Sequence, residues 1–169
     1  MDFSTLIKER HSVRSYLAKH VETEKLNAIL EAGRLAPTAA NLQPITVFVV
    51  EGKETLAKLA KAANIYDAPL ALIICADKEV AWTRPFDGMQ TTDIDASIVT
   101  DHMMLQASAL GLGSVWICYF KPDVVKKEFA IPENLIPVNI LAIGYADESS
   151  TPEKIRDDMG KFAIFTDGE

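Results

Sequence analysis

The segment Arg10-His11-Ser12-Val13-Arg14 carries two guanidinium groups on either side of a hydroxyl. In an extended chain alternate side chains point the same way, so Arg10, Ser12 and Arg14 would share one side. Two guanidinium forks flanking a hydroxyl suit a phosphate group, which accepts bidentate charge-assisted hydrogen bonds. The alternative interpretation is a solvated basic turn, which is the commoner origin of such a short charged pattern.

A second segment with chemical potential runs from Ala36 to Pro44, with the sequence Ala-Pro-Thr-Ala-Ala-Asn-Leu-Gln-Pro. Its small residues and two prolines allow the backbone to approach a ligand closely. Thr38, Asn41 and Gln43 offer donors and acceptors suited to the edge of a heterocycle. The alternative is an ordinary loop that ends a helix, built from common turn residues.

A third segment contains Gly111 and Gly113, which match half of a dinucleotide-binding glycine fingerprint. The order of elements is reversed, however, because these glycines follow a predicted helix and precede a predicted strand. Trp116 also stands at the third glycine position. The pattern therefore argues against a Rossmann site and is explained by a helix C-terminus that enters a buried strand.

Other catalytic constellations are missing from the sequence. There is no Gly-x-Ser-x-Gly elbow for acyl transfer. His11, His20 and His102, taken with the two cysteines, do not have the spacing of zinc ligands. Asp93 and Asp95 are placed to begin a helix, with Asp93 as its expected N-cap, rather than to hold a metal.

Four segments, taken together and in this order, resemble the nitroreductase family of FMN-dependent oxidoreductases. They are RHSVR at 10–14, APTAANLQP at 36–44, DIDASIVTDHMMLQASALGLGSVWI at 93–117 and IPVNILAIGYA at 136–146. The resemblance covers nearly the whole chain and looks closest to the short, single-domain members of clostridial type.

The resemblance implies FMN bound at the interface of an intertwined homodimer, with both protomers contributing to each site. Arg10, Ser12 and Arg14 would hold the FMN phosphate and ribityl chain, with His11 adjacent. Along the flavin ring the resemblance implies Pro37, Thr38, Ala39 and Asn41 from the other protomer, Gln43 nearby, Asn64 at the polar edge, and Trp116, Ile117, Cys118 and Tyr119. A basic residue near the C-terminus would meet the phosphate, with Arg156 the first choice and Lys154 the second.

The implied activity is that of an FMN-dependent NAD(P)H oxidoreductase. NADH or NADPH would give a hydride to flavin N5, and a small-molecule electron acceptor, such as a nitroaromatic or a quinone, would then be reduced in a ping-pong cycle. One alternative is a non-catalytic FMN-binding or sensing module, because Cys118 and Tyr119 would crowd the ring. Another is a dehalogenase-like flavoenzyme of the same fold, with the loop at 77–92 as its lid.

The elements that must position these residues follow from the apolar spacing. Helices are predicted at 3–10, 23–36, 53–63, 93–110 and 122–130, and strands at 45–50, 69–76, 114–120 and 138–145, with Thr23 as an N-cap. This alternation predicts an α+β fold of three-layer α/β/α type, in which helices flank a central, largely parallel or mixed β-sheet. One domain, 1–169, is expected. Its last part, 147–169, would be an arm reaching the partner subunit, with the apolar run FAIFT at 162–166 adding to a sheet edge, either of its own chain or of the partner.

Composition limits the classes of partner. The 169 residues are 49% hydrophobic, yet the net charge is −7, so nucleic acid and anionic membranes are not expected as partners. The apolar surplus favours a second protein surface, here a homodimer. Because no signal peptide or membrane-spanning run is visible, and the two cysteines sit in apolar runs as expected of free thiols, the sequence predicts a cytoplasmic protein.

Overall fold

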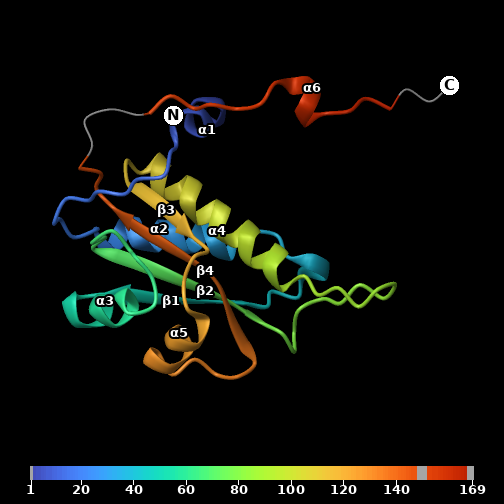
Figure 1. The fold of residues 1–169 in the computed structure, drawn as a ribbon, viewed down its shortest axis with the longest axis horizontal. Coiled ribbons are helices and arrows are strands. Elements are labelled where there is room, and N and C mark those ends of the chain that lie inside the picture. The colour runs from blue at the N-terminus through green and yellow to red at the C-terminus, as the bar shows by residue number, and fades with distance from the viewer. Residues whose placement is uncertain (1, 148–151, 167–169) are drawn as a thin grey trace.

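Residues 2–147 and 152–166 are described by the computed structural model, in which helices lie on both sides of a β-sheet (Figure 1). In chain order the elements are α1 (Phe3–Glu9), α2 (Thr23–Arg34), the 3-10 helix η1 (Ala39–Asn41), β1 (Ile45–Glu51), α3 (Lys53–Ala60), β2 (Leu70–Asp77), α4 (Thr92–Ala109), β3 (Gly113–Ile117), α5 (Pro122–Glu128), β4 (Leu135–Gly144) and α6 (Met159–Phe162). Most elements fall close to their predicted ranges. β3 ends at Ile117, before the predicted end at 120, and the next two residues, Cys118 and Tyr119, are exposed.

The predicted α+β class is confirmed, and of the two sheet types that the sequence left open, largely parallel or mixed, the largely parallel one is wrong. The strand order is β1-β2-β4-β3, and each neighbouring pair is antiparallel. Glu51 at the end of β1 pairs with Leu70 at the start of β2, so α3 lengthens a turn at one end of the sheet rather than crossing it. The one parallel pairing among the described residues is an isolated bridge between Ser12 and Ser114.

The sheet and the helices on its two faces form three layers, as the sequence predicts. α2 and α4 pack on one face, and α3 and α5 pack on the other. β2 runs through the middle, with every side chain from Leu70 to Ala76 fully buried. Each large apolar side chain buried in this way contributes roughly 1.5–3 kcal/mol. No helix in the described ranges is both long and apolar enough to cross a membrane.

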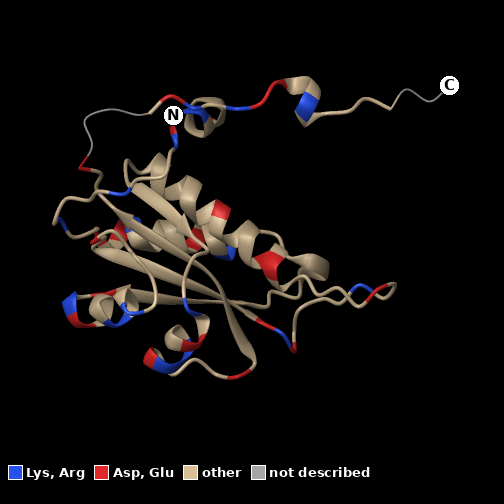
Figure 2. Cartoon of the chain, viewed as in Figure 1, with Lys and Arg blue, Asp and Glu red and all other residues tan. Residues whose placement is uncertain are grey.

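The long helix α4 is the element that most of the remaining structure contacts. Its residues Val99, Met103 and Ala107 are buried against α2 and the sheet. Figure 2 shows charges of both signs on α3 and α5, whereas α4 carries Asp residues and neither Lys nor Arg. A helix that is apolar over more than one face is buried widely, which agrees with the predicted character of this segment.

Two predicted helix caps are wrong. The N-cap of α4 is Thr91, and Asp93 lies inside the first turn. The N-cap of α2 is Glu22, and Thr23 is the first helical residue. Neither cap side chain accepts a hydrogen bond from a backbone N–H of its helix, so tertiary packing rather than local capping fixes the start of both helices.

The segment after β4 leaves the sheet. Residues 152–166 run past α1 and away from the molecule (Figure 1), and the run at 162–166 forms no strand with the sheet of its own chain. Its pairing with the sheet edge of a partner stays a prediction. Phe162 belongs to α6, and Ile164 and Phe165 are exposed without pairing to the sheet of their own chain. The neighbouring edge of β3 is already occupied, since Val13 N donates to Ser114 O at 3.0 Å. Residues 148–151 and 167–169 of the predicted arm lie outside the described residues.

Close contact between β3 and the segment at 10–14 yields a stability prediction. A Cβ added at Gly113 would lie 2.6 Å from Val13 Cγ2 and 2.9 Å from Val13 Cβ. We expect Gly113→Ala to lower the free energy of unfolding by about 1–3 kcal/mol through overpacking, measured by urea denaturation. Gly160→Ala is the control, because its Cβ would meet only Asp158 Oδ1 at 3.4 Å. Equal stability of the Gly113→Ala variant and the wild type would contradict this packing.

Candidate cofactor-binding site

The segment at 10–14 lies along the outer edge of β3, the edge that does not pair with β4. It leaves α1 at Arg10 and runs extended, as predicted, with Ser12 bridged to Ser114. Val13 is buried, so the alternation of an extended chain directs Ser12 and Arg14 to the opposite side. The Arg14 guanidinium lies 6.0 Å from the centre of the Tyr66 ring, a cation–π distance.

The beginning of the C-terminal segment adds further positive charge at this edge. Lys154 Nζ donates to the carbonyls of Ile7 at 2.6 Å and Arg10 at 2.7 Å. Burial, followed by the charges of Arg10 and Arg156, lowers the pKa of Lys154. No ion pair among the described residues joins these three cations to a carboxylate. Arg10, Lys154 and Arg156 therefore bring positive charge together at this edge.

Arg156 and Lys154 differ in how close the structure places them to the segment at 10–14. Arg156 is exposed, and its Nη1 donates to the neighbouring Ile155 carbonyl at 2.6 Å. Lys154 is directly hydrogen-bonded to the backbone of Arg10. The sequence predicts Arg156 as the first choice for the phosphate. Of the two side chains, however, Lys154 is the one that hydrogen-bonds to the segment at 10–14.

The end of β3 is held by one buried amide. Asn139 Oδ1 accepts hydrogen bonds from Trp116 Nε1 at 2.8 Å and from Cys118 Sγ at 3.6 Å. Asn139 is only 2% exposed, and its Nδ2 donates to Thr100 Oγ1 on α4 at 3.2 Å. Sequence reasoning did not single out Asn139, although a lone amide within the apolar strand VNILAIG is a visible signal. The side chain of Ile117 is buried in the opposite face of the sheet, so only its backbone can face a ligand on this side.

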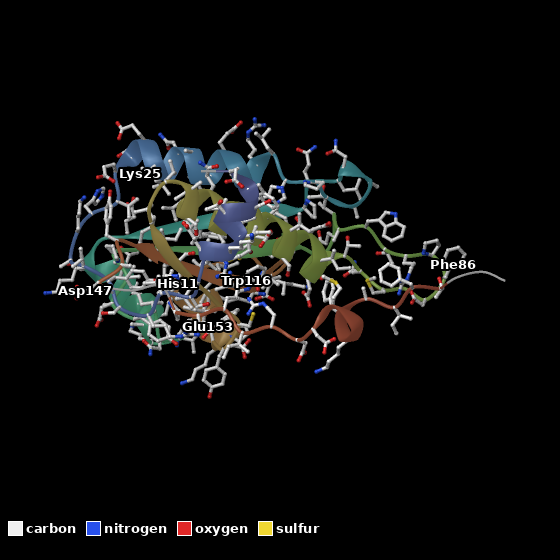
Figure 3. The ribbon with its side chains drawn as sticks, turned by 90° about the horizontal axis from the view of Figure 1, so that it is seen from above. His11, Lys25, Phe86, Trp116, Asp147 and Glu153 are labelled. Carbon is white, nitrogen blue, oxygen red and sulfur yellow. The ribbon has the colours of Figure 1, made fainter. Side chains whose placement is uncertain are left out.

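A groove of about 350 Å³ opens beside the end of β3, and Asn64 and Tyr119 are among the residues that line it. Asn64 Oδ1 accepts a hydrogen bond from Tyr66 N at 3.0 Å, which leaves the amide nitrogen of Asn64 as an available donor. Tyr119 is 97% exposed, so within a single chain it does not cover this surface. His11, labelled in Figure 3, lines a smaller cavity near the start of β3.

The loop before β1 has an unusual backbone. Ala40, Asn41 and Gln43 have positive φ values of 50°, 55° and 52°, a conformation that costs roughly 1–2 kcal/mol for each residue other than glycine. Internal hydrogen bonds brace the loop, since Thr38 Oγ1 accepts from Gln43 N at 3.0 Å and Gln43 Nε2 donates to the Asn41 carbonyl at 3.3 Å. Pro37 is exposed. Strain of this kind is typical of ligand-binding loops.

One chain does not bring all predicted site residues together. The loop at 37–43 leads into β1, at the opposite edge of the sheet from β3 (Figure 1). Three strand spacings separate these edges, roughly 14 Å. Segment 10–14, Asn64, Lys154 and the end of β3 lie at one edge, and the loop at 37–43 lies at the other. The described residues include no group of three or more potential metal ligands.

The structure is that of an α+β protein with a cationic sheet edge, and comparison with known proteins gives the family. The model of the nitroreductase family matches residues 7–65 and 56–145. A nitroreductase family protein from Clostridium difficile 630 is 51% identical, with 98% of both chains covered and a TM-score of 0.94. The chain therefore belongs to the nitroreductase family, as the sequence motifs predict.

Two further relatives carry more specific names. An FMN-dependent nitroreductase from another Clostridium difficile strain is 32% identical, covering 96% of this chain and 98% of that one, with a TM-score of 0.80. An FMN reductase [NAD(P)H] from Bacillus subtilis is 29% identical, covering 88% of this chain and 68% of that protein. The resemblance to this family extends over nearly the whole chain.

The two cysteines give a chemical test of the geometry at the end of β3. Burial in β2 raises the pKa of the Cys75 thiol to about 12, whereas Cys118 is exposed. We expect Ellman's reagent at pH 8 to modify one thiol in the folded, FMN-free protein and a second after denaturation. Cys118→Ser should remove the rapid reaction. Rapid modification of two thiols in the folded protein would contradict the burial of Cys75.

Proposed function

We propose that the protein is an FMN-dependent NAD(P)H oxidoreductase that reduces nitroaromatics, quinones or a related small electrophile. The observation that carries the proposal is the cationic group of Arg10, Lys154 and Arg156 at the outer edge of β3, together with the groove lined by Asn64 beside the end of the same strand. The names of the FMN-dependent nitroreductase and the FMN reductase among its relatives support the same chemistry.

The residues at this edge fit FMN. Arg10, Arg14 and Lys154 offer positive charge to a phosphate, and the Ser12 hydroxyl lies between the two arginines in sequence. The lowered pKa of Lys154, caused first by burial and then by neighbouring cations, is what a site suited to an anion would produce. Asn64, with a free amide donor, would meet the carbonyl edge of the flavin ring.

FMN, when bound, supplies the electron-transfer chemistry by taking two electrons from NADH or NADPH and giving them to the acceptor. The residues of this chain bind and orient. Asn139 fixes Trp116 and the end of β3, so that backbone donors near Cys118 would face the ring. Cys118 and Tyr119 are exposed rather than folded over the site, which leaves a face open for donor and acceptor to use in turn. Use of one face by donor and acceptor in turn would give a ping-pong order.

A second copy of the chain would complete the site. The loop at 37–43 lies across the sheet from the cationic group, so we propose that the loop of one protomer meets the cationic edge of the other. Phe162, Ile164 and Phe165 are 83–86% exposed on the C-terminal segment, and an exposed apolar segment of this size marks an interaction surface. The proposal is an intertwined homodimer in which this segment reaches the partner.

Absorbance spectroscopy tests the proposed function directly. Purified protein, loaded with FMN and freed of excess, should show the flavin bands near 450 nm, a general property of oxidised flavins. Anaerobic NADH or NADPH should bleach these bands, and a nitroaromatic or quinone should restore them. Protein that stays colourless after FMN addition would refute the proposal. Protein that stays yellow with both nicotinamides would instead identify a non-catalytic FMN-binding module.

A matched pair of lysine variants tests the phosphate contact. Lys154→Ala should weaken FMN binding by about 1.5–3 kcal/mol, because a charge-assisted contact to the phosphate is lost. Lys161→Ala is the control, since Lys161 lies further along the same segment and pairs with Asp157 at 2.9 Å. Titration of FMN fluorescence gives both dissociation constants. If the two variants bind FMN equally well, the phosphate lies elsewhere.

A further inference from the structure

A buried carboxylate in the first turn of α4 joins two separate segments. Asp95 is 1% exposed. Its Oδ1 accepts a hydrogen bond from Ala39 N at 2.9 Å, and its Oδ2 accepts one from Thr91 Oγ1 at 2.9 Å. A buried acidic side chain is rare unless its oxygens are satisfied, and here each oxygen has a donor from a different part of the chain.

The hydrogen bond from Ala39 N to Asp95 connects the strained loop to helix α4. Among the described residues, the other hydrogen bonds made by 38–43 stay within the loop. Without the hydrogen bond to Asp95, the positive-φ residues Ala40 and Gln43 would be held only by local contacts. A strained backbone persists only where its surroundings determine it, so Asp95 is the residue that fixes this loop on the body of the protein.

Through Thr91, the second carboxylate oxygen of Asp95 connects α4 to the hairpin at 82–91. Thr91 N donates to the Trp82 carbonyl at 3.0 Å. A bridge between Thr83 and Gln90 and the bidentate pair of Arg84 with Asp87 make the hairpin a defined structure. Its tip carries Phe86, which is 91% exposed and lies at one extreme of the molecule (Figure 3).

We propose that Asp95 is a positioning residue that sets the loop at 37–43 and the base of the hairpin as one unit against the cofactor site of the partner copy. The proposal rests on the proposed function, because it assigns the loop to the flavin ring. Asp95 itself touches neither cofactor nor substrate in this scheme. It acts through the backbone of Ala39, and through Thr91 it sets the direction in which the hairpin extends.

Three variants separate positioning from general stability. Asp95→Ala removes both acceptors. Asp95→Asn keeps one carbonyl oxygen for Ala39 N. Asp93→Ala is the control, because Asp93 is an exposed acidic residue in the same helical turn and its loss changes the same helix-end charge.

The measurements are the FMN dissociation constant, the visible circular dichroism of bound FMN at saturation, and the KM for a nitroaromatic acceptor. For Asp95→Ala we expect FMN binding about tenfold weaker, as for one lost buried hydrogen bond. We also expect a changed visible spectrum of the bound flavin and a raised KM. Asp95→Asn should restore the wild-type spectrum, and Asp93→Ala should not change it. A purely structural role would lower thermal stability and leave the spectrum of the bound flavin unchanged.

Ala39→Pro tests the same hydrogen bond by changing its donor instead of its acceptor. It keeps the proposal testable if Asp95→Ala does not fold. It deletes the donor N–H and keeps the carboxylate. Thr38 has φ −129° and ψ 157°, which suits the residue before a proline, and Ala39 is the first residue of η1, where proline is tolerated. Ala39→Pro should therefore give the same spectral change.

A wild-type flavin spectrum and FMN affinity in Ala39→Pro would overturn the role of Asp95. Failure of the wild-type protein to bind FMN is a different result, because it refutes the proposed function before any variant is compared.

Discussion

The width of the β-sheet is the constraint on which the proposed site depends. β1 and β3 form its opposite edges, so the loop that leads into β1 and the cationic segment that lies along β3 stay far apart in one chain. The interior of the sheet leaves no freedom to reduce this separation, because β2 and most of β4 are fully buried between helical layers. We therefore propose that a ligand that uses both edges is bound between two copies. The proposed homodimer follows from sheet geometry together with the exposed apolar C-terminal segment.

Helix α4 connects the loop at 37–43 with the end of β3. Near its N-terminus Asp95 holds the strained loop, and one turn further on Thr100 accepts a hydrogen bond from Asn139, which fixes Trp116 at the end of β3. These buried polar contacts lie within an otherwise apolar layer, where an unsatisfied polar group is costly. Each helix α4 thus orders both the end of β3 in its own chain and the loop proposed to serve the partner.

Much of the fold and part of the candidate site were predictable from the sequence. Apolar periodicity predicted the helices and strands, and the extended path of 10–14 was predicted as well. The shared side expected for Arg10, Ser12 and Arg14 stays a prediction, since Arg10 Nη1 donates to Met104 Sδ on α4 and the Arg14 guanidinium lies over the Tyr66 ring. Periodicity reports burial and not direction, so the antiparallel pairing of β1 with β2 was missed. The anchor of the loop was missed because Ala39 and Asp95 are distant in sequence, and Asp95 by itself resembles an ordinary helix-start residue. The run at 162–166 has strand-forming residues, but the β3 edge of its own chain is already occupied by Val13.

Subunit complementation tests the composite site most directly. One variant carries Arg10→Ala with Lys154→Ala at the cationic edge, and the other carries Ala39→Trp in the loop, so that neither binds FMN alone. If each site takes its two parts from different copies, random mixing of unfolded chains followed by refolding yields heterodimers with one intact site, and FMN binding returns to about a quarter of the wild-type level. If both parts come from one chain, every site stays defective, and a mixture that binds no FMN would contradict the account.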